Sequence, residues 1–191
     1  MKIVIHAGMH KTGSSAIQDH FFETVYPGLR YARWNNGNHC GLFVLLFQEP
    51  DRLASYWGFK PMGPEFCTRL PQMRKDWRAS LAEDLTQAQV AGEILVFSAE
   101  DISGPQFHEA VGRMAAFFRE WSADITVLAY VRRPLSYATS AFQERLKGGT
   151  VETLEAEKLW PFYKARFARL DEVFGRNQVI LKPYDRGCLT G

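Results

Sequence analysis

The residues with the clearest chemistry lie near the start of the chain, in the segment GMHKTGSS at residues 8–15. An apolar run ends before this segment and a helical pattern begins within it. We therefore expect its backbone N–H groups and the helix N-terminus to point at one spot, which is how proteins bind anions. The expected donors are the charged, hydroxyl and backbone groups of Lys11, Thr12, Gly13, Ser14 and Ser15.

The spacing of the glycines resembles a P-loop, but the lysine is displaced. Gly8 and Gly13 are five residues apart, and Ser14 stands where a P-loop has its lysine. A P-loop kinase combines that lysine with a magnesium ion held partly by an acid at a strand end. Here two of the predicted strands end in Ser98 and Val131. The pattern therefore favours an anion other than a magnesium-bound triphosphate.

A second anion-binding pattern follows the third predicted strand, where Arg132 and Arg133 precede Pro134. Proline suits the first turn of a helix, and Ser140 lies on that helix, eight residues after Arg132. Open α/β sheets bind ligands at the carboxyl ends of their strands. An arginine fork with a nearby hydroxyl suits a phosphate group. The polar stripe of this helix contains Ser136, Ser140, Gln143 and Lys147.

Together the two patterns resemble the nucleotide-binding motifs of the sulfotransferase superfamily. Residues 6–15 resemble its 5′-phosphosulfate-binding loop, and residues 132–134 with Ser140 are similar to its 3′-phosphate-binding motif. The likeness is greatest to the bacterial and Golgi-type carbohydrate sulfotransferases, although Arg133 stands where their motif has asparagine. It extends from residue 1 to the fourth predicted strand and leaves out residues 26–73.

This resemblance implies 3′-phosphoadenosine 5′-phosphosulfate (PAPS) as the donor and adenosine 3′,5′-bisphosphate as the product. Lys11 would neutralise the phosphosulfate bridge as it breaks, with residues 12–15 supplying further donors. Arg132 and Ser140 would hold the 3′-phosphate. No metal is expected, because a sulfuryl group carries less charge than a phosphoryl group and a lysine can replace magnesium.

Transfer to a hydroxyl also needs a general base at the same sheet edge. Glu100 is the best-placed carboxylate, because it closely follows the second predicted strand. The competing interpretation is that Glu100 or Asp101 caps the next helix. Asp101, His10 and His39 are the alternative bases. His6, at the end of a buried strand, is expected to be a hydrogen-bonded core residue.

Four strands and several helices are expected to position these groups. The predicted strands are residues 2–7, 93–98, 124–131 and 178–181, all continuously apolar, as in parallel strands buried on both faces. Helical patterns cover residues 14–25, 74–90, 107–121, 134–147 and 160–174, and the aromatic stripes of 107–121 and 160–174 are expected to face the core. The alternation predicts an α/β fold, a three-layer α/β/α domain with a central parallel sheet of the P-loop NTPase type.

Length and composition limit the class of protein. The 191 residues suit a single domain, 1–191, in which the proline-rich residues 26–73 form a substrate-facing insertion with short helices. The run at residues 42–47 is expected to be a buried helix or strand. The chain stops soon after the fourth predicted strand, so the C-terminal part of the family fold is expected to be absent.

Charge and cysteine content indicate the partners and the location. The 23 Lys+Arg against 21 Asp+Glu leave a net charge of +2, which excludes a strongly basic nucleic-acid binder. Three cysteines, Cys40, Cys67 and Cys188, without CxxC spacing, favour a reducing compartment. No segment has the length of a membrane span or a signal-peptide core. We expect a cytoplasmic protein of bacterial type with a small-molecule or glycan acceptor, and the oligomeric state is not predicted.

The leading interpretation is an enzyme that transfers a sulfuryl group in line from PAPS to a hydroxyl or amine of a glycan, glycolipid or small metabolite. The alternatives are a P-loop nucleotide kinase and a non-catalytic nucleotide-binding module of the same fold. The kinase requires a magnesium-binding acid that the predicted strands lack. The presence of Lys11, Ser14, Arg132 and Ser140 argues against a module that has lost its activity.

Overall fold

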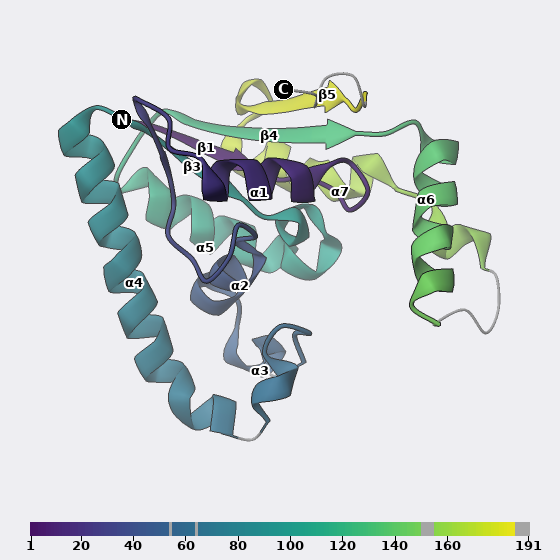
Figure 1. Ribbon diagram of the computed structural model, residues 1–191, viewed down its shortest axis with the longest axis horizontal. Helices are drawn as coiled ribbons and strands as arrows, with labels where there is room; N and C mark the ends of the chain where they lie inside the picture. The colour runs from purple at the N-terminus through teal and green to yellow at the C-terminus, as the bar shows by residue number, and fades with distance from the viewer. Residues whose placement is uncertain (54, 64, 150–154, 186–191) are drawn as a thin grey trace.

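Five parallel strands form one sheet at the centre of the computed structural model, which describes residues 1–53, 55–63, 65–149 and 155–185 (Figure 1). The sheet order is β2-β3-β1-β4-β5. The strands are β1 (Lys2–His6), β2 (Leu29–Tyr31), β3 (Ile94–Ser98), β4 (Ile125–Val131) and β5 (Val179–Pro183). In this register Ile5 of β1 lies between Phe97 of β3 and Val127 of β4, and all three side chains are buried. The predicted parallel sheet is confirmed.

The strand β2 has no counterpart among the predicted strands, and it joins residues 26–73 to the edge of the sheet. This region supplies an edge strand of three residues and also α2 (Cys40–Phe47), whose residues Leu42–Phe47 are buried in the core. The remaining elements here are α3 (Pro50–Leu53), η1 (Lys60–Met62) and the first part of α4 (Glu65–Ala91). Much of the region therefore belongs to the domain itself, since Leu53, Phe59 and Phe66, which follow α2, are also buried in the core.

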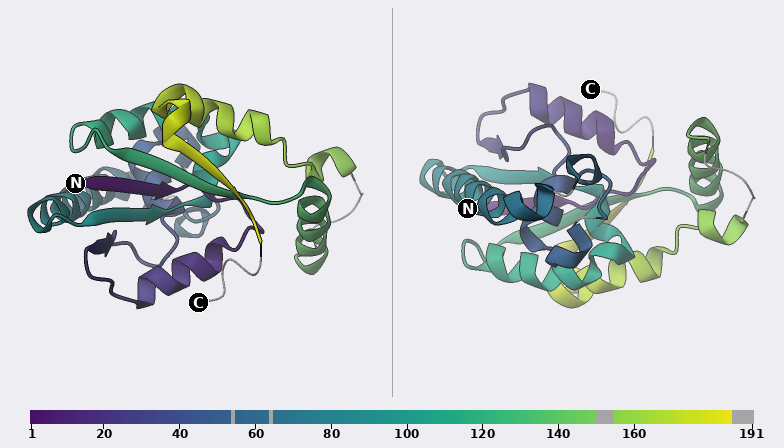
Figure 2. Two further views of the ribbon diagram at one scale, coloured as in Figure 1. Left: turned by 90° about the horizontal axis from the view of Figure 1, so that it is seen from above. Right: turned by 90° about the horizontal axis from the view of Figure 1, so that it is seen from below.

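Helices cover both faces of the sheet, which confirms the three-layer α/β/α architecture. Figure 2 shows α1 (Ser14–Glu23) on one side and α5 (His108–Arg119) with α7 (Tyr163–Phe174) on the other. The long helix α4 (Glu65–Ala91) runs along one side of the molecule, and α6 (Pro134–Lys147) extends from the opposite end (Figure 1). Short 3-10 turns complete the described chain: η2 (Glu100–Ser103), η3 (Pro105–Phe107), η4 (Ala156–Leu159) and η5 (Arg176–Gln178).

Aromatic packing between α2, β3 and α5 forms the centre of the core. Phe118 of α5 lies 5.2 Å from Phe97 and 6.0 Å from Phe43, measured between ring centroids. In the stripe predicted for residues 107–121, the side chains up to Phe118 are buried as expected, and Trp121 is half-buried against the core. The prediction that Trp160 continues such a stripe on the last helix is wrong. Because α7 begins only at Tyr163, Trp160 lies before the helix and remains 50% exposed.

The helix α6 is the least buried of the helices flanking the site. Within it only Tyr137 is buried, whereas Leu135 and Leu146 of its apolar stripe are exposed.

In the described part of the chain, no helix has the length and apolar character required to cross a membrane. The carboxyl ends of β1, β3 and β4 lie at one edge of the sheet, and the predicted site residues follow these three ends.

Candidate functional site

The loop between β1 and α1 is closed by its own hydrogen bonds. The buried Thr12 hydroxyl donates to the Met9 carbonyl at 2.6 Å and accepts from the Met9 N–H at 3.3 Å. Lys11 and Gly13 adopt left-handed backbone conformations, with φ of 66° and 80°. This turn lets α1 begin at Ser14, immediately behind the loop. The Thr12 hydroxyl therefore stabilises the loop, and Thr12 is not among the residues that line the cavity described below.

Gly8 is required by the close approach of its neighbours. A Cβ at this position would lie 2.5 Å from Ser14 Oγ and 3.0 Å from the His6 ring. The Gly8 carbonyl accepts a hydrogen bond from Ser103 Oγ at 3.0 Å, which ties the loop to η2. The first glycine of the predicted motif thus has a steric role in packing the loop.

Residues of both predicted anion-binding patterns line one cavity of about 550 Å³. Its lining includes most of the predicted residues, together with three that the sequence did not single out. The predicted residues are Lys11, Gly13, Ser14, Ser15, Glu100, Arg132, Ser140 and the alternative base His10, and the others are Asn38, Glu144 and Tyr184. The predicted pattern is thus brought together except for Thr12. The exposed Arg133 lines a neighbouring cavity that Arg132 shares.

The guanidinium group of Arg132 connects the two motifs directly. Its Nη1 donates to the Lys11 carbonyl at 3.2 Å, and its Nε donates to Ser136 Oγ at 2.7 Å. The same group lies 5.5 Å above the centre of the Tyr184 ring, and the Tyr163 hydroxyl donates to the Arg132 carbonyl. Arg132 is therefore held from several sides at the edge of the cavity.

The side chain of Lys11 forms an ion pair with Glu144, the Nζ and Oε2 atoms being 2.7 Å apart. Glu144 is absent from the predicted site, although it stands four residues after Ser140 and eight after Ser136, on the same face of α6. That spacing was the available signal. The carboxylate is exposed, and its hydrogen bond with Lys11 lowers its pKa.

Glu100 and Asp101 are buried carboxylates bridged by the imidazole of His10. His10 Nδ1 contacts Glu100, and His10 Nε2 lies 3.4 Å from Asp101 Oδ1. Hydrogen bonds to Asp101 and Glu100 raise the pKa of His10 to about 9. Burial acts to raise the pKa of Asp101, but hydrogen bonds from His10 and Tyr56 outweigh it and lower that pKa. At neutral pH His10 is therefore a cation and already holds the proton that a base must be free to accept.

The candidate base His39 has a structural role in the core, as does His6. His39 is completely buried; its Nε2 donates to the Ala32 carbonyl at 2.7 Å, and its Nδ1 accepts from the Ser98 N–H at 3.1 Å. Burial lowers its pKa to about 4, as it does for His6, whose Nδ1 pairs with Ser98 Oγ at 2.7 Å. The expectation of a hydrogen-bonded core residue is confirmed for His6.

The helix-capping interpretation of the two acids is wrong. Glu100 and Asp101 lie inside η2, which follows Ala99, and no side chain caps the start of that turn. The next helix, α5, is preceded by Phe107 and likewise has no side-chain cap. Both carboxylates are instead paired with His10, and Asp101 also accepts from the Tyr56 hydroxyl at 2.9 Å.

The His10 bridge predicts a pH dependence of stability. Because folding raises the pKa of His10 from 6.5 to about 9, its contribution is complete below pH 6.5 and is lost as pH rises through 9. The imidazole is more than half exposed, so we expect at most about 1 kcal/mol. Urea unfolding across this range should show a steeper loss for the wild type than for His10→Gln. Equal slopes would contradict a charged bridge.

A second cavity, of about 410 Å³, adjoins the first. Asn38 lines both, and Tyr56, which lines the second, donates to the Asp101 carboxylate. Trp57 is 69% exposed beside Tyr56, and Trp34 packs against Trp77 with centroids 4.4 Å apart. We call this cavity the aromatic groove; its lining also includes Asn35, Asn36, Cys40, Gly41, Gly58, Phe59, Met62, Arg69 and Met73.

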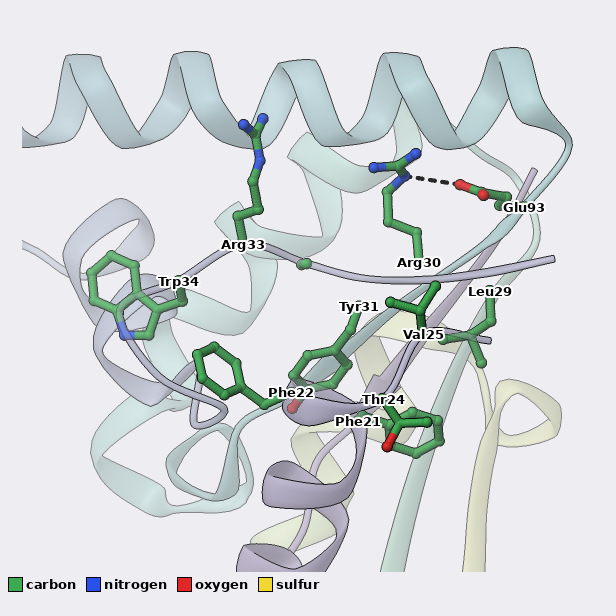
Figure 3. Close-up of a pocket in the computed structure, with 11 residues that line it drawn as sticks. Phe21, Phe22, Thr24, Val25, Leu29, Arg30, Tyr31, Arg33, Trp34 and Glu93 are labelled. Atoms are coloured by element: carbon green, nitrogen blue, oxygen red, sulfur yellow. Dashed lines mark hydrogen bonds and ion pairs between the residues drawn. The ribbon is translucent and has the colours of Figure 1, made fainter. Parts of the chain in front are cut away.

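A further pocket, of about 340 Å³, lies between α1, β2 and α4 (Figure 3). Arg30 and Arg33 extend toward α4, whereas the rings of Phe21 and Phe22 lie on the other side of the pocket (Figure 3). Arg30 pairs with Glu93, and Arg33 pairs with carboxylates of α4. Both arginines are therefore neutralised by carboxylates of the protein itself.

Comparison with known proteins places the fold. No family model and no curated protein matches the chain. Among solved structures, the sulfotransferase from Alicyclobacillus acidocaldarius is similar, with a TM-score of 0.53 and 14% identity over 96% of this chain and 73% of that one. The chain therefore has a sulfotransferase-like fold. Among the described residues, no group of three or more His, Cys, Asp or Glu side chains is placed to hold a metal ion.

Proposed function

We propose that the protein is a sulfotransferase that takes its sulfuryl group from PAPS. The observation that carries this proposal is the contact between the two anion-binding motifs, in which Arg132 donates to the Lys11 carbonyl. A donor with a 5′-phosphosulfate and a 3′-phosphate presents two separate anionic ends to two such motifs. Ordinary adenine nucleotides lack the second end. The sulfotransferase-like fold supports the same conclusion.

The loop residues would bind and polarise the phosphosulfate. Lys11, Ser14 and Ser15 line the cavity, and α1 begins beside it at Ser14, whose hydroxyl donates to the Met9 carbonyl within the loop. In the reaction a bond forms between the acceptor oxygen and sulfur, while the bond from sulfur to the bridging oxygen breaks. The electron pair stays on that oxygen, and the leaving group is adenosine 3′,5′-bisphosphate. Lys11 would stabilise the charge that develops there, as preorganised cations do in such reactions.

Glu100 is the group that we assign as general base. It lines the cavity, whereas Asp101 is engaged by both His10 and Tyr56. The His10 cation beside Glu100 would orient its carboxylate, and Glu100 would accept the proton of the acceptor hydroxyl. His39 is excluded because both of its ring nitrogens are already hydrogen-bonded in the core.

The acceptor would enter through the aromatic groove. The cavity of about 550 Å³ that Lys11 and Arg132 line is the donor cavity of this proposal. The aromatic groove shares Asn38 with it and contacts Asp101 through the Tyr56 hydroxyl. The exposed ring of Trp57 offers a stacking surface, and the amides of Asn35 and Asn36 can both donate and accept hydrogen bonds. Stacking rings combined with amides suit a glycan or another hydroxylated small molecule.

The proposal predicts that Glu100→Gln reduces transfer about 10²–10⁴-fold, the usual contribution of a general base. Binding of adenosine 3′,5′-bisphosphate should stay within about twofold of wild type, because the loop and Arg132 are unchanged. The measurement is transfer from radiolabelled PAPS to a panel of neutral glycosides and phenols, with Glu109→Gln as a control on the exposed surface of α5. An unchanged rate for Glu100→Gln would show that another group takes the proton. Transfer from ATP in place of PAPS would favour the kinase alternative.

A further inference from the structure

The carboxylate of Glu144 is placed among the groups that would bind the phosphosulfate. Its Oε2 lies 2.7 Å from Lys11 Nζ, and both side chains line the donor cavity with Ser14 and Ser15. A negative charge is unexpected in a cavity built for an anionic donor, because it repels the ligand. A carboxylate at this position must therefore influence which anions the cavity accepts.

The position of Glu144 follows from the way α6 is attached. At the start of the helix, Ser136 accepts a hydrogen bond from Arg132, while Ser140 and Glu144 follow at intervals of four residues. Residues at this spacing lie on one face of a helix, and Ser140 and Glu144 both line the cavity. An exposed ion pair of this kind adds little to folding stability. Its larger effect is on the charge that Lys11 presents to a ligand.

The charges that line the cavity nearly cancel. Three cations, His10, Lys11 and Arg132, face two carboxylates, Glu100 and Glu144. With His10 protonated, the sum of these side chains is 3 − 2 = +1. Replacing Glu144 by glutamine would raise it to +2. The cavity thus carries little excess positive charge, and the carboxylate nearest to Lys11 is that of Glu144.

The two chemical groups that this charge can distinguish are a terminal sulfuryl and a terminal phosphoryl. A sulfuryl terminus carries a single negative charge, whereas a terminal phosphate with a second pKa near ~6 carries close to two at pH 7. We propose that Glu144 is a specificity-determining residue that disfavours the second charge of a phosphoryl terminus and so selects the phosphosulfate. This inference rests on the proposed function, because it assumes that the terminus lies near Lys11.

The test compares PAPS with adenosine 3′-phosphate 5′-diphosphate, which has phosphate in place of sulfate and keeps every other group. Calorimetry without acceptor should show that wild type prefers PAPS. Glu144→Gln should reduce that preference about tenfold by improving diphosphate binding more than PAPS binding, the scale expected for removal of one nearby like charge. Glu144→Asp keeps the charge and should keep part of the preference. Glu172→Gln removes an exposed carboxylate paired with Arg169 on α7 and should change nothing.

Each contrary outcome has a definite meaning. If Glu144→Gln tightens both ligands by the same factor, Glu144 only competes for Lys11, and the selectivity proposal is overturned. An unchanged ratio, or a wild type that binds both ligands equally, also overturns it while leaving the donor site intact. A wild type that binds neither ligand contradicts the proposed function itself, and the inference with it.

Discussion

Replacing Lys11 with methionine is expected to reduce sulfuryl transfer about 10²–10³-fold, the usual loss when one charge-stabilising group is removed from an active site. Methionine keeps an unbranched side chain without the ammonium group. The left-handed backbone at position 11 imposes a similar cost on either residue, so the protein should remain folded. Steady-state transfer rates and urea unfolding of the same preparation measure the two effects separately.

This substitution also releases Glu144 from its ion pair. The double variant Lys11→Met/Glu144→Gln therefore shows how much of the loss comes from the freed carboxylate. Lys75→Met, on the exposed surface of α4, is the matched control and should retain full activity. If Lys11→Met kept a turnover within about twofold of wild type, Lys11 would not stabilise the breaking bridge, and the assignment of the loop would be wrong.

Replacing Arg132 with alanine is expected to weaken binding of adenosine 3′,5′-bisphosphate about 10- to 100-fold. Hydrogen bonds to charged groups contribute about 1.5–3 kcal/mol, which corresponds to this range. AMP, which lacks the 3′-phosphate, should bind the variant nearly as it binds wild type. Calorimetric titration of both nucleotides into both proteins gives the comparison.

The geometry of Arg132 requires a further control, because it also holds Lys11 and Ser136. A loop disturbed by the loss of these bonds would weaken AMP and the bisphosphate equally, and that result would show a positioning role for Arg132. Arg132→Lys keeps the charge but loses the two-pronged donor, so it should bind the bisphosphate with intermediate affinity. Arg133→Ala removes the exposed neighbouring charge and should have a smaller effect.

The parts of the fold and site that were predictable are those with local causes. The loop that begins at Gly8 can be located from the sequence to within a few residues. It follows an apolar run, contains two spaced glycines and precedes a helical pattern. The core strands β1, β3 and β4 are mostly apolar because helices cover both faces of the sheet. In contrast, β2 has only three half-buried residues at the sheet edge, which leaves no pattern to detect.

The groups that escape prediction depend on contacts between distant segments. The role of His39 is decided by its partners, the Ala32 carbonyl and the N–H of Ser98, a residue 59 positions away. The two carboxylate partners of His10 are distant from it in the sequence, because Glu100 and Asp101 follow β3. Sequence spacing within a helix cannot show that Glu144 meets Lys11, since this ion pair joins α6 to the loop after β1.

The misplacement of Trp160 has a different cause, the start of the helix. The spacing of Trp160 fits a helical stripe, but the helix begins only at Tyr163. Trp160 is therefore outside the helix, and helical periodicity does not determine where its side chain points. Helix starts are among the least certain features of a sequence.

The central claim, a donor site built for a nucleotide with a 3′-phosphate and a 5′-phosphosulfate, is tested most directly by binding to the wild-type protein. Calorimetry with adenosine 3′,5′-bisphosphate, AMP and magnesium-ATP needs no knowledge of the acceptor. Binding at both Lys11 and Arg132 predicts that the bisphosphate binds at least about tenfold more tightly than AMP, from the added charged hydrogen bonds. Equal binding of all three nucleotides, or a preference for magnesium-ATP, would contradict it.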